Sequence, residues 1–340
     1  MKILIISADR TTSSGHPQNI GDAFLTDALS ASLRRSGYEV VIADFGVADR
    51  VGSTETRMRV GGIRGLAGVI RGADAVLVGG GTLLQDDQPD RPFAGLPRLC
   101  LTAAVLARAL GKKFVVFGVG VDPVRRRRAR SAISLTLRLA RVWVRDSASQ
   151  ARAAALMSRH PEVSGDVSLF DYSPREPGTA LERPGTGALL ALNRREAASL
   201  TIEQIGALRT RWGAVQFVSM DQGEDWDGRS LSAPVSALLG ADDEGHSWQT
   251  VRSTISQADV VIASRMHALY MGVLSAVPVV AISGFAKVDA FASDFHVETA
   301  ATIGEATERT GRVDTAAVEA AVAALEAAKS GLMTYLGGAR

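Results

Sequence analysis

The chain has 340 residues, of which 46% are hydrophobic and 22% charged, and its formal net charge at pH 7 is +2. This length and composition are typical of a soluble globular enzyme with two domains. The near-balanced charge and the 5% aromatic content exclude a basic nucleic-acid binder that stacks bases on aromatic side chains.

The single cysteine and the N-terminus limit the location of the protein. Cys100 alone can form neither an internal disulfide framework nor a cysteine zinc cluster, and its apolar helical surroundings favour a buried structural role. The initial MKILIISADR lacks the length and cleavage pattern of a signal peptide and predicts a β-strand. No apolar run reaches membrane-spanning length, so we expect a cytoplasmic protein.

Short apolar runs alternate with helical patterns along the first half of the chain, which predicts parallel α/β layers. The predicted strands are Lys2–Ser7, Glu39–Asp44, Ala75–Val78, Lys113–Gly118 and Arg141–Val144. The predicted helices are Asp22–Ser36, Ile63–Gly72, Phe93–Leu110, Val124–Leu139 and Ser147–His160.

The alternation resumes after a segment rich in proline, glycine and charge at residues 173–187, which predicts an interdomain linker. The strands and helices predicted beyond it are Ala188–Asn193, Val215–Ser219, Val260–Ala263, Val279–Ile282 and Phe295–Glu298, with Ile202–Trp212, Trp248–Gln257, His267–Ala276 and Thr315–Tyr335. We therefore predict an α/β protein with two doubly wound Rossmann-like domains at residues 1–172 and 188–312, an interdomain cleft, and a C-terminal helix within 313–340.

The stretch from Ala263 to Lys287 carries the strongest chemical signal. Ser264, Arg265 and His267 follow one predicted buried strand, and Lys287 follows the next. The carboxyl ends of parallel strands meet at the edge where open α/β sheets bind ligands. Two cations and a histidine at that edge predict a site for an anionic ligand, with His267 as a proton donor.

Two motifs in the first half follow predicted strands. Asn19-Ile20-Gly21-Asp22 opens the first helix, where it forms either a helix cap or a turn that faces a ligand, with Asp22 binding a sugar hydroxyl. Gly79, Gly80, Gly81 and Thr82 follow the third predicted strand, where the glycines either let backbone amides face a ligand or form a sharp turn.

Charged segments allow two interpretations each. Arg145 at the end of the fifth strand forms either a surface ion pair or part of a site. The run Arg125–Arg128 is either a solvated helix face or a contact with anionic lipid head groups at the inner face of the membrane. The acidic loop from Asp221 to Asp227 is either solvated or a contact for acceptor hydroxyls. The histidine spacings predict no metal site.

Together the motifs NIGD, VLVGGGTLLQD, VRD, GDVSL, the acidic loop and SRMHALYMGVLSAVPVVAISGFAK, in this order, resemble the polysaccharide pyruvyl transferase family over residues 1–290. The resemblance implies a GT-B-like fold and a transferase of exopolysaccharide or cell-wall polysaccharide biosynthesis. Such an enzyme moves the enolpyruvyl unit of phosphoenolpyruvate onto two hydroxyls of a saccharide, which forms a pyruvate ketal and releases phosphate.

The resemblance implies that His267 and Arg265 are catalytic and that Arg145 and Lys287 serve the donor. The full set of expected donor-binding residues is Arg145, Lys287, Ser264, Gly79, Gly80, Gly81 and Thr82. The expected acceptor-binding residues are Asn19, Asp22, Asp86 and Asp225. We expect no metal and no cofactor other than phosphoenolpyruvate as co-substrate, and a saccharide acceptor that is free, lipid-linked or nucleotide-linked.

The expected chemistry agrees with these residue types. Phosphoenolpyruvate carries a carboxylate and a phosphate, which arginine and lysine bind, and a histidine with a pKa near neutral delivers a proton to its methylene carbon. Two alternatives remain open from the sequence. One is a GT-B-like glycosyltransferase that uses a nucleotide sugar, and the other is a non-catalytic protein that binds sugars or anions.

Overall fold

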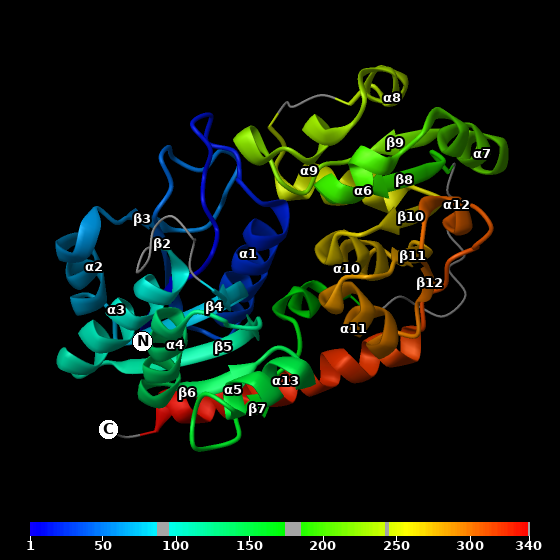
Figure 1. Cartoon of the computed structure of the whole chain (residues 1–340). Coiled ribbons are helices and arrows are strands. Elements are labelled where there is room, and N and C mark those ends of the chain that lie inside the picture. The colour runs from blue at the N-terminus through cyan, green and yellow to red at the C-terminus, as the bar shows by residue number, and fades with distance from the viewer. Residues whose placement is uncertain (87–94, 174–184, 242–244, 339–340) are drawn as a thin grey trace.

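A computed structural model of the chain describes residues 1–86, 95–173, 185–241 and 245–338. Within them the chain forms two parallel β-sheets, each covered by helices on both faces (Figure 1). The first sheet has seven strands in the order β3-β2-β1-β4-β5-β6-β7, and the second has five in the order β12-β11-β10-β8-β9. The strand order reverses between β1 and β4 and between β8 and β10, so both sheets are doubly wound.

The N-terminal lobe contains the first sheet and the helices that cover it. Its strands are β1 (Lys2–Ile6), β2 (Glu39–Asp44), β3 (Arg57–Arg59), β4 (Ala75–Leu84), β5 (Lys113–Val121), β6 (Arg141–Val144) and β7 (Glu162–Val163). Its helices are α1 (Ile20–Arg35), α2 (Gly62–Arg71), α3 (Leu96–Ala109), α4 (Arg127–Leu139), α5 (Ser147–Ala154) and the 3-10 helix η1 (Val167–Asp171).

The C-terminal lobe contains the second sheet. Its strands are β8 (Ala188–Ala191), β9 (Val215–Phe217), β10 (Val260–Ala263), β11 (Val279–Ile282) and β12 (Glu298–Ala300). Its helices are α6 (Arg194–Ser199), α7 (Ile202–Trp212), η2 (Gly223–Asp225), η3 (Asp227–Ser230), α8 (Ala233–Leu239), α9 (Trp248–Gln257), α10 (Met266–Leu274), α11 (Ala286–Asp294) and α12 (Ile303–Ala306).

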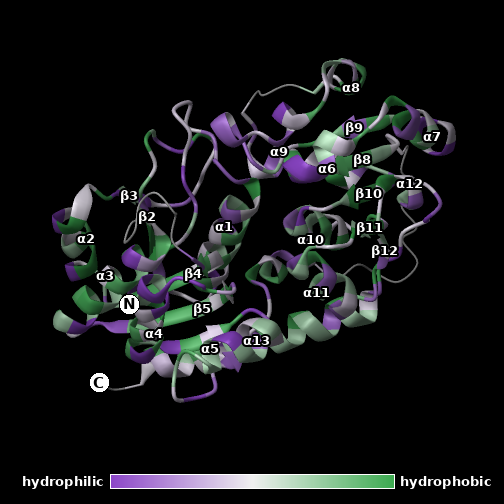
Figure 2. Ribbon diagram, in the orientation of Figure 1, coloured by the Kyte–Doolittle hydropathy of each residue, from purple (hydrophilic) through white to green (hydrophobic). Residues whose placement is uncertain are grey.

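The first strand shows how the core is divided. Ile3 and Ile5 pack with α1, η1 and the C-terminal helix on one face of the sheet, whereas Leu4 and Ile6 pack with α2 to α5 on the other. Successive side chains of a strand point to opposite faces, so a run that is apolar throughout must be covered on both sides. Figure 2 shows hydrophobic colour along β5 and hydrophilic colour in many of the loops.

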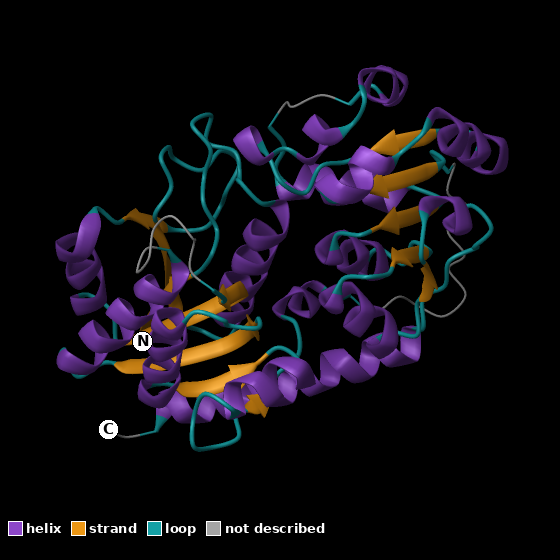
Figure 3. Ribbon diagram, viewed as in Figure 1, coloured by secondary structure: helices purple, strands orange, loops and turns teal. Residues whose placement is uncertain are grey.

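The last helix, α13 (Thr315–Gly337), leaves the C-terminal lobe and runs back along the N-terminal lobe (Figure 3). There the Lys113 side chain donates hydrogen bonds to the carbonyls of Tyr335 and Leu336 at 3.1 and 2.8 Å. Trp143 of β6 packs edge-on against the ring of Tyr335, with ring centroids 6.5 Å apart. The helix that the sequence predicts at the C-terminus therefore joins the two lobes.

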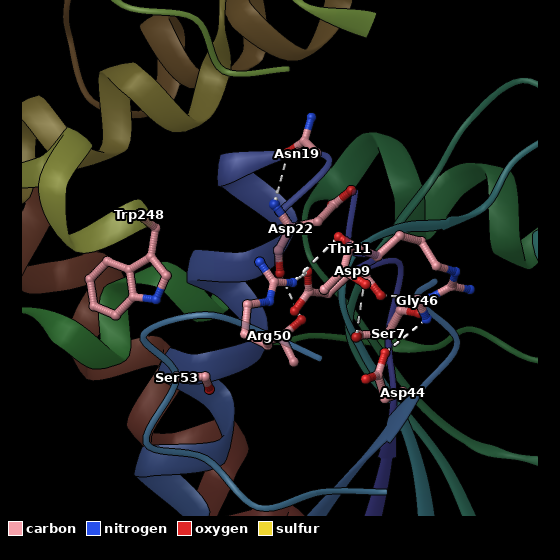
Figure 4. Close-up of polar contacts among 12 residues, drawn as sticks. Ser7, Asp9, Thr11, Asn19, Asp22, Asp44, Gly46, Arg50, Ser53 and Trp248 are labelled. Atoms are coloured by element: carbon pink, nitrogen blue, oxygen red, sulfur yellow. Dashed lines mark hydrogen bonds and ion pairs between the residues drawn. The ribbon is translucent and has the colours of Figure 1, made fainter. Parts of the chain in front are cut away.

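The lobes also meet at the start of α1. The backbone N–H of Ile20 donates to the carbonyl of Met220 at 2.8 Å, and that of Gln222 donates to the carbonyl of Gln18 at 2.8 Å. Next to this contact, Trp248 of α9 donates its ring N–H to Asp27 of α1 at 2.8 Å. In Figure 4 the Trp248 ring extends from the C-terminal lobe toward the loop of Arg50 and Ser53.

The predicted fold class is confirmed, and Glu39–Asp44, Arg141–Val144, Val260–Ala263 and Val279–Ile282 are strands with the predicted bounds. The prediction of a third strand that stops at Val78 is wrong, because β4 continues through the glycines to Leu84. Short elements such as β3, β7 and α12 have too little periodicity to be found from sequence. Residues 174–184 of the predicted linker lie outside the described residues.

Candidate functional site

A cleft of about 1130 Å³ lies between the two lobes. It lies at the carboxyl edges of both sheets. In the first sheet it adjoins β1 and β4, and in the second it adjoins β8 and β10, which are the strand pairs where the strand order reverses. Ala8 follows β1, Thr82 belongs to β4, Asn193 follows β8 and Ser264 follows β10, and all four line the cleft. The rule for open α/β sheets places ligands at this position.

His267 lies in the first turn of α10 and lines the cleft. Its ring packs against the backbone of Gly21, because a Cβ on Gly21 would lie 2.0 Å from Nδ1 of His267. Its Nε2 is buried and has no hydrogen-bond partner among the described residues. Burial, reinforced by the cations Arg145 and Lys287, lowers the pKa of His267 to about 4. The imidazole is therefore neutral at pH 7 without a bound anion, which differs from the near-neutral pKa that we expected.

Arg145 follows β6, and only 6% of its surface is exposed. Its Nε donates to Asp146 at 3.0 Å, and its Nη1 lies 3.8 Å from Asp166 and lacks a hydrogen bond. A Cβ at Gly120 would lie 2.8 Å from Nη2 of Arg145, so a side chain there would displace this guanidinium. Burial lowers the pKa of Arg145, but Asp166 and Asp146 outweigh it and hold that pKa above its usual value.

Lys287 lies in the first turn of α11 and reaches across to the N-terminal lobe. Its ammonium donates to the hydroxyl of Thr82 at 3.2 Å and lies 3.1 Å from a carboxylate oxygen of Asp122. The lysine side chain is 40% exposed, so this contact is weak and can be exchanged for a stronger anion. Lys287 and Arg145 thus bring a positive charge to the cleft from each lobe.

Arg265 precedes α10, and its guanidinium contacts the carboxylates of Asp221 and Asp227. Asp227 is fully buried and also accepts hydrogen bonds from the backbone N–H groups of Met220 and Asp221 at 3.1 and 3.2 Å. Burial lowers the pKa of Arg265, but the two carboxylates outweigh it and raise that pKa. Its Nε is buried without a hydrogen bond, so one donor remains for a ligand.

Ser264 has a hydroxyl that accepts a hydrogen bond from the backbone N–H of Asn193 at 2.8 Å, which leaves its own O–H to donate. The three expected donor-binding glycines lie elsewhere: Gly79, Gly80 and Gly81 belong to β4 and do not line the cleft. They pack against α1, and Gly80 and Gly81 have φ angles of +74° and +96° that favour glycine. The glycines therefore allow the close approach of α1, and Thr82 is the residue of this motif that reaches the cleft.

Asp22 lies in the cleft wall, in the first turn of α1. Its backbone N–H is capped by the Asn19 side chain at 2.9 Å, so the interpretation of this motif as a helix cap is confirmed for Asn19. A Cβ at Gly81 would lie 2.5 Å from Oδ1 of Asp22, which shows how closely this carboxylate packs on β4. Burial, with Asp9 and Asp221 nearby, raises the pKa of Asp22 to about 7.

The other two expected acceptor residues are engaged in structural contacts. Asp86 lines the cleft, but its carboxylate accepts hydrogen bonds from the backbone N–H groups of Arg125 and Arg126 at 3.0 and 3.2 Å. Asp225 does not line the cleft; it pairs with Arg194 at 2.7 Å on the surface. In the acidic loop, Asp221 and Asp227 take the positions next to the site, because η2 and η3 turn Asp225 outward.

Three charged residues near the site had no specific role in the sequence analysis. Arg10 lines the cleft, where its guanidinium lies 4.8 Å from the ring of Phe45 and donates to the carbonyl of Asp9 at 2.7 Å. Arg152 of α5 also lines the cleft, and Asp166 lies behind Arg145. The GDVSL motif contains Asp166, so the motif carried a signal, but nothing in the sequence connected it to Arg145.

No three histidine, cysteine or carboxylate side chains of the described part cluster as metal ligands. None of the helices in the ranges given above combines the length and apolarity needed to cross a bilayer.

Several solved structures share the fold. Anabaena Alr3699/HepE, solved with UDP and glucose, is 14% identical over 98% of this chain and 100% of its own, with a TM-score of 0.61. A putative UDP-N-acetylglucosamine 2-epimerase from Listeria monocytogenes is 13% identical over 96% and 88%, with a TM-score of 0.57. The UDP-GlcNAc 2-epimerase from Neisseria meningitidis is 12% identical over 99% and 100%, with a TM-score of 0.55. The structural similarity shows a shared GT-B-like fold, and at these low identities it shows nothing about function.

Comparison with curated proteins by sequence finds no match. A family model does match, for the polysaccharide pyruvyl transferases, over residues 19–284. The matched range begins at Asn19 and includes Asp22, Arg145, Arg265 and His267, which the structure brings to one cleft. The chain therefore belongs to the polysaccharide pyruvyl transferase family, whose members are transferases.

Proposed function

We propose that the protein transfers the enolpyruvyl unit of phosphoenolpyruvate to two hydroxyls of a saccharide, which forms a cyclic pyruvate ketal and releases phosphate. The observation that carries this proposal is the convergence of Arg145, Arg265, Lys287 and His267 on one cleft. Family membership supports a pyruvyl transfer, and the charges of the cleft support an anionic donor.

The donor is held by groups that have hydrogen-bonding capacity left. Arg145 Nη1 and Arg265 Nε are buried without partners, and a phosphate or carboxylate supplies the acceptor oxygens that they lack. Lys287 exchanges its contact with Asp122 for the more highly charged phosphate. The hydroxyls of Ser264 and Thr82 add neutral donors at the two strand ends.

His267 becomes an acid only when the donor binds. Without a bound anion the pKa of His267 is about 4, because the ring is buried beside cations. The negative charge of phosphoenolpyruvate offsets Arg145, Lys287 and Arg265, so the pKa of His267 rises and the imidazole takes up a proton. A neutral imidazole converted in this way to imidazolium is ready to protonate the methylene carbon.

The first half of the reaction joins the saccharide to the donor. The oxygen of one hydroxyl forms a bond to the central carbon of the enolpyruvyl unit. The electron pair of the carbon–carbon double bond takes the proton from His267, which leaves a methyl group. Asp22, whose pKa is about 7, accepts the proton that the hydroxyl loses.

The second half closes the ketal. The bond between the central carbon and the phosphate oxygen breaks, and the phosphate leaves with the electron pair and the proton held by Asp22. The second hydroxyl attacks the resulting oxocarbenium carbon and gives its proton to His267. The products are the ketal and hydrogen phosphate, and both side chains return to their starting protonation states.

The test is phosphate release from phosphoenolpyruvate in the presence of a pool of saccharide acceptors, with the ketal methyl group detected by NMR. We expect His267→Ala to lose at least about a thousandfold in turnover while its thermal unfolding stays within a few degrees of wild type. Turnover near the wild-type rate in this variant rejects the role of His267.

Thermal stabilisation distinguishes the proposal from a nucleotide-sugar transferase. A ligand that binds only the native state raises the unfolding temperature by mass action, so phosphoenolpyruvate is expected to stabilise the protein and Lys287→Ala to weaken that effect. Stabilisation by nucleotide sugars alone overturns the proposed donor. Stabilisation by phosphoenolpyruvate without phosphate release from any acceptor points instead to a non-catalytic anion-binding protein.

A further inference from the structure

Three neighbouring helices on one face of the first sheet carry positive charge without any negative charge. α2, α3 and α4 contain no aspartate or glutamate, although the whole chain has a formal net charge of only +2. All arginines of these helices are exposed: Arg64, Arg71, Arg98, Arg108, Arg127, Arg128, Arg130 and Arg138. We call the exposed side chains of these three helices the α2–α4 face; Figure 1 shows the helices side by side over the first sheet.

The same face exposes one large apolar side chain on each helix. Ile63 of α2 is 63% exposed, Val105 of α3 is 47% exposed and Leu135 of α4 is 44% exposed. A single exposed apolar residue needs no explanation, but three on adjacent helices among arginines form the pattern of a surface that meets anionic lipid.

Among the described residues, three carboxylates at the borders of the face make contacts with other groups. Asp74 accepts a hydrogen bond from the backbone N–H of Lys2 at 2.8 Å. Asp86 accepts from the backbone of the Arg125–Arg128 run, and Glu162 pairs with Arg141. These carboxylates reduce the positive potential at the rim, whereas the sequences of α2, α3 and α4 contain no acidic residue.

The face is continuous with the cleft. Leu96 and Leu99, at the N-terminal end of α3, line the cleft, as does Pro123 shortly before α4. Helices that follow parallel strands begin at the carboxyl edge of the sheet, which is the edge that holds the site. A surface that binds along α2, α3 and α4 therefore lies beside the mouth of the cleft.

We propose that the α2–α4 face binds an anionic lipid bilayer and so brings a lipid-linked saccharide to the cleft. This inference rests on the proposed function for its acceptor, while the bilayer contact stands on the face alone. Arginines near an anionic surface are attracted to it, so several together hold a protein on the membrane without a spanning helix. The three apolar side chains enter the head-group region between the arginines.

Vesicle binding tests the proposal with the full-length protein. We expect it to sediment with vesicles that contain about 30% phosphatidylglycerol and not with pure phosphatidylcholine, and binding to fall as salt screens the charges. The variant R98E/R108E/R127E/R138E is expected to lose at least about tenfold in affinity for the anionic vesicles. Ile63→Ser combined with V105S and L135S is expected to weaken the same binding.

A matched variant on the other lobe controls for the change in net charge. R195E/R211E/R309E/R312E alters four exposed arginines of the second half of the chain by the same amount and is expected to bind anionic vesicles like wild type. Equal losses in both variants overturn the assignment of the surface. Absence of vesicle binding by wild type, or tight binding to DNA in place of vesicles, overturns the bilayer as the partner.

Phosphate release with a soluble saccharide acceptor separates this inference from the proposed function. We expect R98E/R108E/R127E/R138E to release phosphate at the wild-type rate, because none of its substitutions touches the site. With a lipid-linked acceptor in vesicles the same variant is expected to be at least about tenfold slower. If wild type binds the vesicles but releases no phosphate with either acceptor, the proposed function fails and the membrane face remains.

Discussion

Gly21 of α1 and His267 of α10 pack against each other across the two lobes, and the space for the imidazole exists because residue 21 has no side chain. One belongs to the NIGD motif and the other to SRMH, so two motifs far apart in the sequence form one contact. The position of the proposed acid is thus set by the N-terminal lobe as well as by the strand that precedes it.

Gly21→Ala is expected to displace His267. A Cβ there would lie 2.0 Å from Nδ1 and 2.9 Å from Cβ of His267, so the ring or the helix must move. Overpacking of this kind costs about 1–3 kcal/mol, and a displacement of about 1 Å lowers catalysis about a hundredfold. Chemical denaturation and phosphate release measure the two effects.

Gly68→Ala provides the matched control, because a Cβ at Gly68 of α2 meets no atom within 4 Å. Alanine is favoured over glycine in a helix, so this variant should be at least as stable as wild type and fully active. In the His267→Ala background the stability cost of Gly21→Ala should fall, because the ring contacts are removed and only the 2.9 Å approach to the Cβ at position 267 remains. If the cost is unchanged in that background, the imidazole ring is not the source of the clash.

The pKa of Asp22 gives a pH dependence of stability with a definite sign. Its pKa rises from an ordinary 3.8 to about 7 in the folded protein, so the folded state holds this proton more tightly than the unfolded state. Stability from this group is therefore complete below pH 4 and is lost as the pH rises to about 7. Asp22→Asn should raise the free energy of unfolding at pH 8 by on the order of 2 kcal/mol. This is less than the full shift in pKa would give, because the side chain is only partly buried and solvent screens its charge.

The same substitution should remove activity. If Asp22 is the base, kcat/KM for wild type rises with pH up to about 7, and Asp22→Asn loses at least about a hundredfold together with this rise. A variant that is more stable at pH 8 but as active as wild type would restrict Asp22 to a structural or binding role.

Donor binding should be accompanied by proton uptake at His267. With a pKa of about 4, His267 lacks this proton at pH 7 before the donor binds, and the charge of phosphoenolpyruvate raises the pKa. Calorimetry in two buffers of different ionisation enthalpy should therefore show that wild type takes up more protons than His267→Gln, by up to about one. Equal proton uptake in the two proteins would show that the histidine stays neutral.

Asp227 and Asp225 lie two residues apart and should respond differently to removal of charge. Asp227 is fully buried against Arg265, so Asp227→Asn should destabilise the protein by about 2–3 kcal/mol and raise the KM for phosphoenolpyruvate as Arg265 loses its orientation. Asp225→Asn alters an exposed ion pair with Arg194 and should leave the stability and the KM for phosphoenolpyruvate close to those of wild type. Thermal unfolding and steady-state kinetics compare the pair; a larger effect at position 225 contradicts the geometry.

The position of the site could be predicted from sequence because it depends on strand ends. Val260–Ala263 and residues 142–144 are continuous buried runs, so the polar residues that follow them had to lie at the carboxyl edge. Contacts that depend on irregular backbone could not be predicted in this way. The outward turn of Asp225 arises from two short 3-10 helices, which leave no periodic signal.

The glycines of β4 show a second limit. A run of three glycines is compatible with a ligand-binding turn and with a strand that a helix approaches closely, and composition does not separate these structures. The deciding feature is the packing of Leu25 and Leu29 of α1 on this strand, which is a tertiary contact. The pKa values of Asp22 and His267 likewise depend on burial that only the assembled cleft creates.

The helix α13 starts in the C-terminal lobe, and its end is fixed to Lys113 and Trp143 of the N-terminal lobe. It is therefore a continuous tie between the lobes that lies away from the cleft. Across the cleft itself, Lys287 of one lobe donates a hydrogen bond to Thr82 of the other. Loosening the end of α13, far from any substrate, would therefore change how often the cleft closes around the donor.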